Sequence, residues 1–442
     1  MQGGVYWGMK RLLFLPVMLV AGCAAQTTTS PTASNTPRPV MASEPDSPAT
    51  ASDSPDAVGR LVGVQDGQTN ALGLTLPAGF RVNVFAQGLD RPRRIAVVPN
   101  VKNKTGYDVA VSQSYASNVV LLRDANGDGI SDSQTTLASQ INKPYGIEFG
   151  GNYIFIAATD AVWRYPFVPG QTQLGGAGQK IATLTQGGYN NHWTRNLLFD
   201  SSKRNLYVTV GSSCNTCEES DPQRAAISVM GPDGSNKRLL ASGLRNPTGI
   251  TWNPATKTLW TVVNERDNLG DDVPPDYLTQ VGKNRFYGWP YAYTTIDKKV
   301  MADPTFGSRS PQKVAATIAP DVPVQAHSAA LGVAFYPLTA TKFPAEFRGD
   351  AFLAFHGSWN RSQKTGYKIV RVNFENGKAT AISDFVTGFL KTDGSNWGRP
   401  VDIQSAPDGS LLFSDDQGGK IWRVSYVGSG ATKSADPSAK NS

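Results

Sequence analysis

Residues 240–252 read LASGLRNPTGITW, and two other segments have the same form: FAQGLDRPRRIAV at 85–97 and LASQINKPYGIEF at 137–149. Each begins with apolar residues, passes through a short polar stretch with a proline, and ends in a run in which apolar residues alternate with others. Looser copies begin at Thr183, Val324 and Phe385. Alternation with a period of two is typical of a β-strand with one buried face. The chain is therefore built on a repeated β unit.

Most copies are followed by a second alternating run, such as YIFIAAT from Tyr153, LYVTVGS from Leu206 and LWTVVNE from Leu259. A third run often follows, as in KIWRVSY from Lys420. The runs are too short and too alternating for the strands of a parallel α/β sheet, and no helix-period segments separate them. Six copies, each with three or four short strands, predict an all-β six-bladed β-propeller. A two-domain β-sandwich is the alternative.

The composition agrees with an all-β fold, since glycine (44) and proline (29) are frequent and charged residues make up only 17%. The formal net charge is +7, but no run of Lys and Arg is interleaved with aromatic residues. We therefore expect no nucleic-acid partner. A modest positive field favours an anionic small molecule instead.

The N-terminus carries a signal of export. Lys10 and Arg11 precede an apolar run that ends in small residues before Cys23, which is the order of a secretory signal. The run is too short to span a bilayer as a stable helix. Because Cys23 ends a box that resembles the bacterial lipobox, we expect residues 1–23 to be a lipoprotein signal and Cys23 to be lipidated. An ordinary cleaved signal is the alternative.

The prediction places the protein in the bacterial periplasm, anchored by lipid alone to the outer membrane. Residues 24–58 are rich in Thr, Ser and Pro and are expected to form a disordered linker. Residues 60–427 would form the propeller domain, and residues 428–442 a disordered tail. Cys214 and Cys217 remain as a Cys-x-x-Cys pair. In an exported protein this spacing favours a disulfide over a redox or zinc pair.

The loops before the repeated strands carry many polar residues. In a propeller these loops open on one face of the central channel, so their side chains would converge there. The residues are Arg93, Arg94, Tyr145, His192, Arg195, Arg245, Asn246, His327 and Arg399. His192 is the best candidate for a general base, because imidazole titrates near neutral pH. Arg195 is expected to stabilise negative charge or to bind a cofactor carboxylate.

A second group of oxygen ligands lies in DANGDGISD, which begins at Asp124. Asp124, Asn126, Asp128 and Asp132 have the spacing of a calcium loop, because alternate positions of a tight loop can present several oxygens to one ion. A plain Asx-rich turn is the alternative.

Several ordered motifs carry a family resemblance: HWTRNLLF from His192, GLRNPTG from Gly243, NERDNLGDD from Asn264, FHGSWNR from Phe355 and WGRPVDI from Trp397. The chain resembles the pyrroloquinoline quinone (PQQ)-dependent sugar dehydrogenases, with the sorbosone dehydrogenase branch closer than soluble glucose dehydrogenase. The resemblance implies a six-bladed propeller that holds PQQ over the channel beside a calcium ion.

The resemblance also assigns roles to single residues. His192 matches the base, and the backbone carbonyls of Asp267 and Asn268 match the calcium ligands. Thr248 stands where the glucose enzymes have Gln, and either Asn360 or Arg361 stands where they have Lys. Together with His327, the expected cofactor-binding set is Arg245, Asn246, Thr248, His327, Asn360, Arg361 and Arg399.

These expectations combine into one function. The chain would oxidise a sugar or sugar-derived aldehyde, of aldose or sorbosone type, with PQQ and calcium, and would pass electrons to a periplasmic acceptor. Two alternatives stay open: a calcium-dependent lactonase or esterase propeller, and a non-catalytic propeller that binds a saccharide or a protein.

Overall fold

The computed structural model describes residues 62–63, 70, 72–99, 105–187 and 192–428. All of them belong to one unit of the chain, residues 48–442. The predicted lipidation site at Cys23, the linker 24–58 and the tail beyond Gly428 lie outside these residues. Within the described part, no helix has the length and apolar character needed to cross a membrane.

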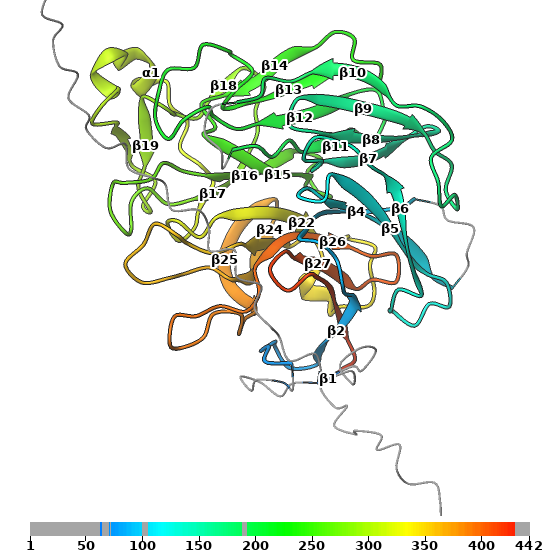
Figure 1. Ribbon diagram of the computed structural model, residues 1–442. Coiled ribbons are helices and arrows are strands. Elements are labelled where there is room, and N and C mark those ends of the chain that lie inside the picture. Colours follow the sequence, from blue (N-terminus) through cyan, green and yellow to red (C-terminus); the bar gives the residue numbers. More distant parts are fainter. Residues whose placement is uncertain (1–61, 64–69, 71, 100–104, 188–191, 429–442) are drawn as a thin grey trace, which may run out of the picture. The chain divides into compact units, whose positions relative to one another are not determined.

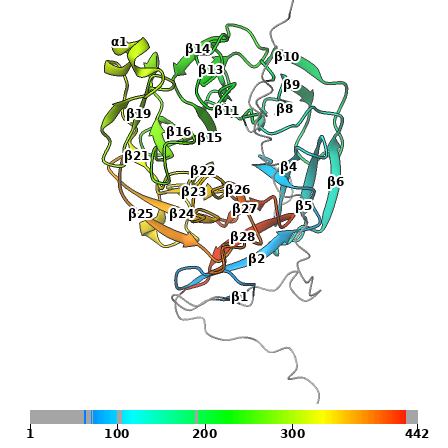
Figure 2. The same cartoon turned by 60° about the vertical axis from the view of Figure 1, so that its left-hand side comes forward.

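Six mainly antiparallel sheets of four or five strands follow one another around a ring (Figures 1 and 2). Sheet one contains β3 (Pro92–Val97), β4 (Tyr107–Gln113), β5 (Asn118–Asp124) and β6 (Ser133–Ala138). Sheet two contains β7 (Ile147–Gly150), β8 (Tyr153–Ala157), β9 (Ala161–Pro166) and β10 (Gln179–Thr183). Sheet three contains β11 (Leu197–Phe199), β12 (Leu206–Val210), β13 (Ala226–Met230), β14 (Arg238–Ser242) and β18 (Arg285–Phe286).

The remaining three sheets complete the ring. Sheet four contains β15 (Asn246–Trp252), β16 (Leu259–Asn264), β17 (Tyr277–Gln280) and β21 (Val322–Pro323). Sheet five contains β22 (Ala330–Phe335), β23 (Ala351–Phe355), β24 (Lys368–Glu375) and β25 (Lys378–Val386). Sheet six contains β26 (Pro400–Ser405), β27 (Leu411–Asp415), β28 (Lys420–Tyr426), β2 (Phe80–Ala86) and β1 (Val62–Gly63).

The first strand of each sheet lies innermost. These strands contact one another in a closed order, β3, β7, β11, β15, β22, β26 and back to β3. Each of the six lies at the end of one of the six sequence copies, so the predicted six-bladed β-propeller is confirmed and the two-domain sandwich is not observed. Glycines of the repeat allow neighbouring innermost strands to approach one another closely. A Cβ on Gly249 would lie 2.8 Å from the Leu331 carbonyl oxygen, and one on Gly332 would lie 2.6 Å from the Cα of Asp402.

The ring closes through the two ends of the folded chain. β2 pairs antiparallel with β28, with Val82 opposite Val424 and Val84 opposite Trp422. The last sheet therefore takes an outer strand from the beginning of the chain. This pairing covers an edge that would otherwise stay open.

The core is divided between the sheets. Six large apolar clusters each join one pair of neighbouring sheets. Between sheets five and six, Phe80 packs edge-on against Phe343 and Phe385 at centroid distances of 4.8 and 5.0 Å. Full burial of one such ring contributes roughly 1.5–3 kcal/mol. The sheets are thereby fixed relative to their neighbours.

One insertion departs from the repeat. Between β18 and β21 the chain forms a two-stranded sheet, β19 (Ala292–Thr294) and β20 (Val300–Ala302), followed by a 3-10 turn at Gly307–Arg309 and the short helix α1 (Pro311–Ala315). A second 3-10 turn, Ala345–Phe347, lies between β22 and β23.

Candidate active site

One end of the propeller collects the candidate residues. In four sheets the start of the innermost strand pairs with the end of the second strand: Pro92 with Gln113, Asn246 with Asn264, Ala330 with Phe355 and Pro400 with Asp415. Residues just before a first strand and just after a second strand therefore share this end, which we call the mouth end. Most of the candidate side chains come from these two kinds of loop.

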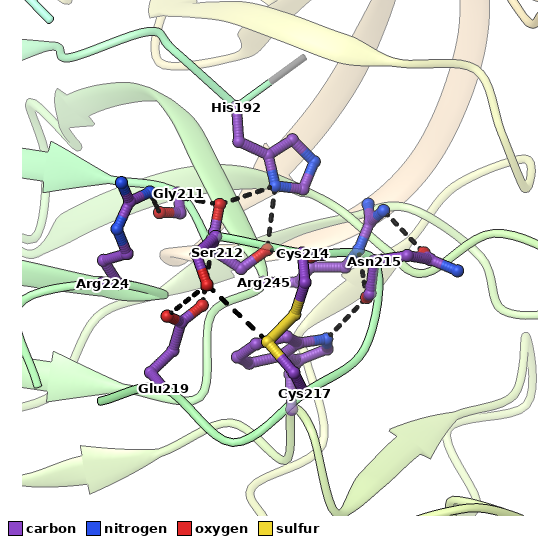
Figure 3. The surroundings of a disulfide bond; sticks show 11 residues. His192, Gly211, Ser212, Cys214, Asn215, Cys217, Glu219, Arg224 and Arg245 are labelled. Atoms are coloured by element: carbon purple, nitrogen blue, oxygen red, sulfur yellow. Dashed lines mark hydrogen bonds between the residues drawn. A yellow bond between two sulfur atoms is a disulfide. The ribbon is translucent and has the colours of Figure 1, made fainter. Parts of the chain in front are cut away.

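His192 lies just before β11 and is buried. Its Nδ1 lies 2.8 Å from the Ser212 hydroxyl and 3.2 Å from the Ser212 carbonyl oxygen (Figure 3). The Ser212 hydroxyl donates its own hydrogen to the Cys214 carbonyl at 2.6 Å. Both oxygens must then accept from Nδ1, so Nδ1 carries the ring proton. In the neutral imidazole Nε2 therefore holds the lone pair that a base needs.

The electrostatic surroundings keep His192 neutral. Burial holds its pKa well below the usual value, and the positive charges of Arg245, Arg195 and Arg224 lower that pKa further. The Ser212 backbone opposes this trend but is outweighed. At neutral pH the imidazole is in the form that can accept a proton.

The other two histidines have the opposite tautomer. His327 donates from Nε2 to the Gly270 carbonyl at 2.9 Å. His356 accepts at Nδ1 from Arg399 at 2.9 Å, so its Nε2 donates to Asp416 at 3.0 Å.

These contacts predict that the three histidines of the apo-protein carry the ring proton on different nitrogens. Since the chain has only three histidines, ¹⁵N-labelled imidazoles can each be assigned with one variant per site. We expect His192 to be protonated at Nδ1, and His327 and His356 to be protonated at Nε2. Long-range ¹H–¹⁵N correlation spectra at pH 7.5 report this directly. A His192 ring protonated at Nε2 would contradict the assignment of the base atom.

Arg195 supports the loop that carries the base. It is fully buried, and its guanidinium donates to the carbonyls of His192 (3.0 Å), Thr194 (2.8 Å) and Thr185 (2.9 Å). Burial and the neighbouring Arg224 lower its pKa to about 9. These bonds to backbone carbonyls position the loop of His192. The role of Arg195 in binding negative charge stays a prediction.

Arg245 forms a buried ion pair with Asp267. Its Nη2 lies 3.0 Å from the Asp267 carboxylate, and it also donates to the carbonyl of Asn215 (3.0 Å) and to the Asn215 side chain (2.8 Å). Asn246 follows in β15 and donates to Asn264 at 3.3 Å. The Asn246 side-chain oxygen is buried and has no hydrogen-bond partner among the described residues.

The two candidates Asn360 and Arg361 separate clearly. Asn360 donates to the Asp267 carboxylate at 3.1 Å, and the same carboxylate lies 4.0 Å from Nδ1 of His327. Arg361 instead donates to the Asp271 carbonyl and to Asp272, at 2.8 Å. Asn360 and His327 thus join the Arg245–Asp267 pair, whereas Arg361 braces the adjacent loop.

Thr248 has a structural contact. Its hydroxyl is fully buried in β15 and donates to the Ala330 carbonyl of β22 at 3.0 Å. It ties two innermost strands together. This bond uses the only hydrogen of the hydroxyl, so the Thr248 side chain cannot also donate to a cofactor.

A second buried cluster joins the predicted residues Arg93 and Arg399 to His356 and Asp416, to which the sequence analysis assigned no role. His356 and Asp416 pair at 3.0 Å, Arg93 pairs with the same carboxylate, and Arg399 donates to His356. Burial, followed by the charge of Arg399, lowers the pKa of His356 to about 4. Burial alone would raise the pKa of Asp416, but its interactions with His356 and with the charged Arg93 lower that pKa. His356 stands in the quoted FHGSWNR motif, whereas Asp416 directly follows the end of β27 and stands in none of the quoted motifs.

The two clusters share the mouth end. Trp193, next to His192, lies 5.3 Å from the Arg93 guanidinium. The segment from His356 to Asn360 has one end in each cluster. We therefore treat them as two walls of one site.

The predicted metal ligands have different positions. Asp267 is at the mouth end, where its carbonyl accepts from Asn215 at 3.2 Å, and Asn268 is exposed with a φ of 68°. The loop from Asp124 lies elsewhere, since Asp124 pairs with Tyr107 at the opposite end of sheet one. Its carboxylates accept backbone N–H groups, for example Gly127 at 2.6 Å, as in an Asx-rich turn. Asn126, Asp128 and Asp132 bond within the same loop, and calcium binding there stays a prediction.

The predicted disulfide between Cys214 and Cys217 is confirmed. In the described part of the chain, these sulfurs and Glu219 are the one group of three or more His, Cys, Asp or Glu side chains whose ligand atoms lie within 4.8 Å of one another. Because both sulfurs are in the disulfide, they do not form a metal site.

Comparison with known proteins gives a consistent result. The TrAA12-like family model matches residues 74–427. An uncharacterized protein of Borreliella burgdorferi is 30% identical over 367 residues, which cover 80% of this chain and 91% of that protein. The pyrroloquinoline quinone-dependent pyranose dehydrogenase of Coprinopsis cinerea is 25% identical, and the match covers 78% of this chain and 54% of that protein. The chain thus spans about half the length of the Coprinopsis relative.

Solved structures agree in fold. The holo form of the PQQ domain of the Coprinopsis cinerea enzyme superposes with a TM-score of 0.68 at 21% identity, over 80% of this chain and 97% of that one.

Proposed function

The chain belongs to the TrAA12-like family, and we propose that it is a PQQ- and calcium-dependent dehydrogenase of a sugar or a sugar-derived aldehyde. One observation carries the proposal: a buried histidine that is protonated at Nδ1 through its contacts with Ser212 shares the mouth end with the buried arginines Arg93 and Arg245. A relative that is a PQQ-dependent pyranose dehydrogenase supports it.

The residues at the mouth end fit PQQ. Its three carboxylates call for charge-assisted hydrogen bonds, which arginine provides best. Arg93, Arg245 and Arg399 supply three guanidinium groups. Nε of Arg93 and the side-chain oxygen of Asn246 are buried without a partner among the described residues. Such groups are costly unless a ligand completes them, and they support a polar ligand here.

Different residues of the chain would transfer the proton, orient the ligand and bind calcium. PQQ, when bound, would supply the acceptor for one hydride, which carries the two electrons of the oxidation. His192 accepts the proton of the sugar hydroxyl at Nε2, and the Ser212 oxygens hold the Nδ1–H as positive charge develops on the ring. Arg245, Asn246 and Asn360 orient the ligand. The backbone carbonyls of Asp267 and Asn268 are the proposed calcium ligands.

The pH dependence follows from the lowered pKa of His192. A base is lost as the pH falls through its pKa, so a lower pKa extends activity to more acidic conditions. We expect the acid limb of kcat/KM to lie well below pH 6.5, the ordinary value for histidine. A dye-linked assay from pH 4 to 9, in buffers of constant ionic strength, measures this limb. Half-maximal kcat/KM at or above pH 6.5 would contradict the assignment.

Reconstitution tests the function as a whole. The apo-protein is incubated with PQQ and calcium, and dye reduction is followed with a panel of aldoses, sorbosone and simple aldehydes. We expect turnover that needs PQQ and that falls when calcium is chelated. Ester or lactone hydrolysis without PQQ would favour a hydrolase, and saccharide binding without dye reduction would favour a binding propeller.

We also propose that the protein works in the bacterial periplasm, held by lipid on Cys23, and passes electrons to a periplasmic acceptor. The order of charged, apolar and small residues before Cys23 supports this. Fractionation of a Cys23→Ser variant, which should leave the membrane fraction, tests it.

A further inference from the structure

A disulfide lies close to the base and to the arginine of the ion pair (Figure 3). Cys214 and Cys217 close a loop of four residues, and Ser212 comes two residues before it. None of these residues was expected to act in the site. Their contacts nevertheless lead to both of its main components.

Asn215, inside the closed loop, makes five hydrogen bonds to three residues. Its carbonyl accepts from Nε of Arg245 at 3.0 Å and from the Trp289 indole at 3.1 Å. Its side-chain oxygen accepts from Arg245 at 2.8 Å and from the Asp267 backbone N–H at 2.8 Å. Its side-chain nitrogen donates to the Asp267 carbonyl at 3.2 Å. One side chain thus fixes both partners of the buried ion pair.

The same loop also reaches the base. The Cys214 carbonyl accepts the Ser212 hydroxyl hydrogen, and this bond leaves the hydroxyl oxygen to accept from His192. The Ser212 backbone N–H donates to the Arg245 carbonyl at 2.8 Å. A rotation of the loop would therefore disturb His192, Arg245 and Asp267 together.

We propose that the disulfide-closed loop Cys214–Cys217, together with Ser212, sets the base and the cofactor-binding ion pair in one arrangement, with Asn215 as the positioning residue. The inference rests on the proposed function, because Arg245 and the Asp267 carbonyl are the groups that would hold PQQ and calcium. Asparagine suits the position because it offers an acceptor and a donor on one short, neutral side chain. The disulfide closes the short loop around Asn215 and so reduces the number of conformations that the loop can adopt. The arrangement of Asn215 with Arg245 and Asp267 is thereby easier to maintain.

The test compares two neighbours in the same closed loop. Asn215→Ala removes three of the five bonds. Thr216→Ala removes a hydroxyl that is buried without a hydrogen-bond partner among the described residues, and serves as the matched control. Binding of PQQ to each apo-protein is measured by equilibrium titration, and thermal unfolding is followed in parallel.

We expect Asn215→Ala to weaken PQQ binding about 10- to 100-fold, as for hydrogen bonds to charged groups, while Thr216→Ala stays within about threefold of wild type. If Asn215→Ala does not fold, Asn215→Asp is used. It keeps the acceptor but loses the donor to Asp267, and its added negative charge competes with the anionic cofactor for Arg245, so weaker binding is again expected. PQQ affinity equal to wild type in the variant tested overturns the inference. Absence of PQQ binding by the wild-type protein would instead overturn the proposed function itself.

Discussion

The His192→Ala variant should lose about 10²–10⁴-fold in kcat, the range that a positioned general base contributes. The variant should still bind PQQ with near wild-type affinity, because it keeps the three guanidinium groups of Arg93, Arg245 and Arg399 that are proposed to bind the carboxylates of PQQ. Steady-state dye reduction gives kcat, and equilibrium titration of the apo-protein gives the affinity for PQQ. The expected pattern is a large loss in rate with little loss in binding.

Ser213→Ala is the matched control for this variant. The Ser213 hydroxyl lies in the same loop as Ser212 but bonds to Glu219, at 2.7 Å, rather than to the base. We expect its kcat to stay within about threefold of wild type. A His192→Ala enzyme as fast as the Ser213→Ala enzyme would remove His192 from the reaction.

Arg245→Ala should have the largest effect on cofactor binding. Removing one partner of a buried ion pair costs about 3–5 kcal/mol because the other charge is left uncompensated, and Asp267 is only 7% exposed. We expect PQQ affinity to fall by more than about 100-fold, and the thermal unfolding midpoint to fall as well. Arg245→Lys keeps the charge but not the planar fork that reaches Asn215 and Asp267 together. It should recover stability better than PQQ affinity.

Arg361→Ala provides the comparison. This arginine pairs with Asp272, whose side chain is 81% exposed, and an exposed pair contributes about 0–1 kcal/mol. We expect PQQ affinity and the unfolding midpoint to stay close to wild type. Equal losses in the Arg245 and Arg361 variants would show that the ion pair with Asp267 has no special role.

The fold could be predicted from the sequence because its signal is local and repeated. Each copy encodes one innermost strand by alternation, and Gly249 and Gly332 mark where neighbouring strands approach. The closure of the ring could not be predicted in the same way. β2 and β28 pair across more than 300 residues, and nothing in either segment specifies the other.

The site was also predictable only where its signal is local in the sequence. His192 and Arg245 stand in motifs, whereas the His356–Asp416 pair joins two loops 60 residues apart. Asn215 acts partly through its carbonyl, which any residue possesses. Conversely, the sequence predicted that Arg195 and Thr248 bind the cofactor or a negative charge, whereas in the structure both side chains donate to backbone carbonyls. A sequence shows that a polar side chain is present but not whether it turns toward a ligand or toward the protein backbone.

The most direct test of the account is a single-turnover experiment. The protein loaded with PQQ and calcium is mixed anaerobically with an aldose, without dye, and the absorbance of the bound quinone is followed in wild type and His192→Ala. We predict rapid, stoichiometric reduction of the quinone in wild type, at a rate that rises with sugar concentration, and reduction about 10²–10⁴-fold slower in the variant. A bound quinone that no sugar or aldehyde reduces, or that both proteins reduce at the same rate, would contradict the account.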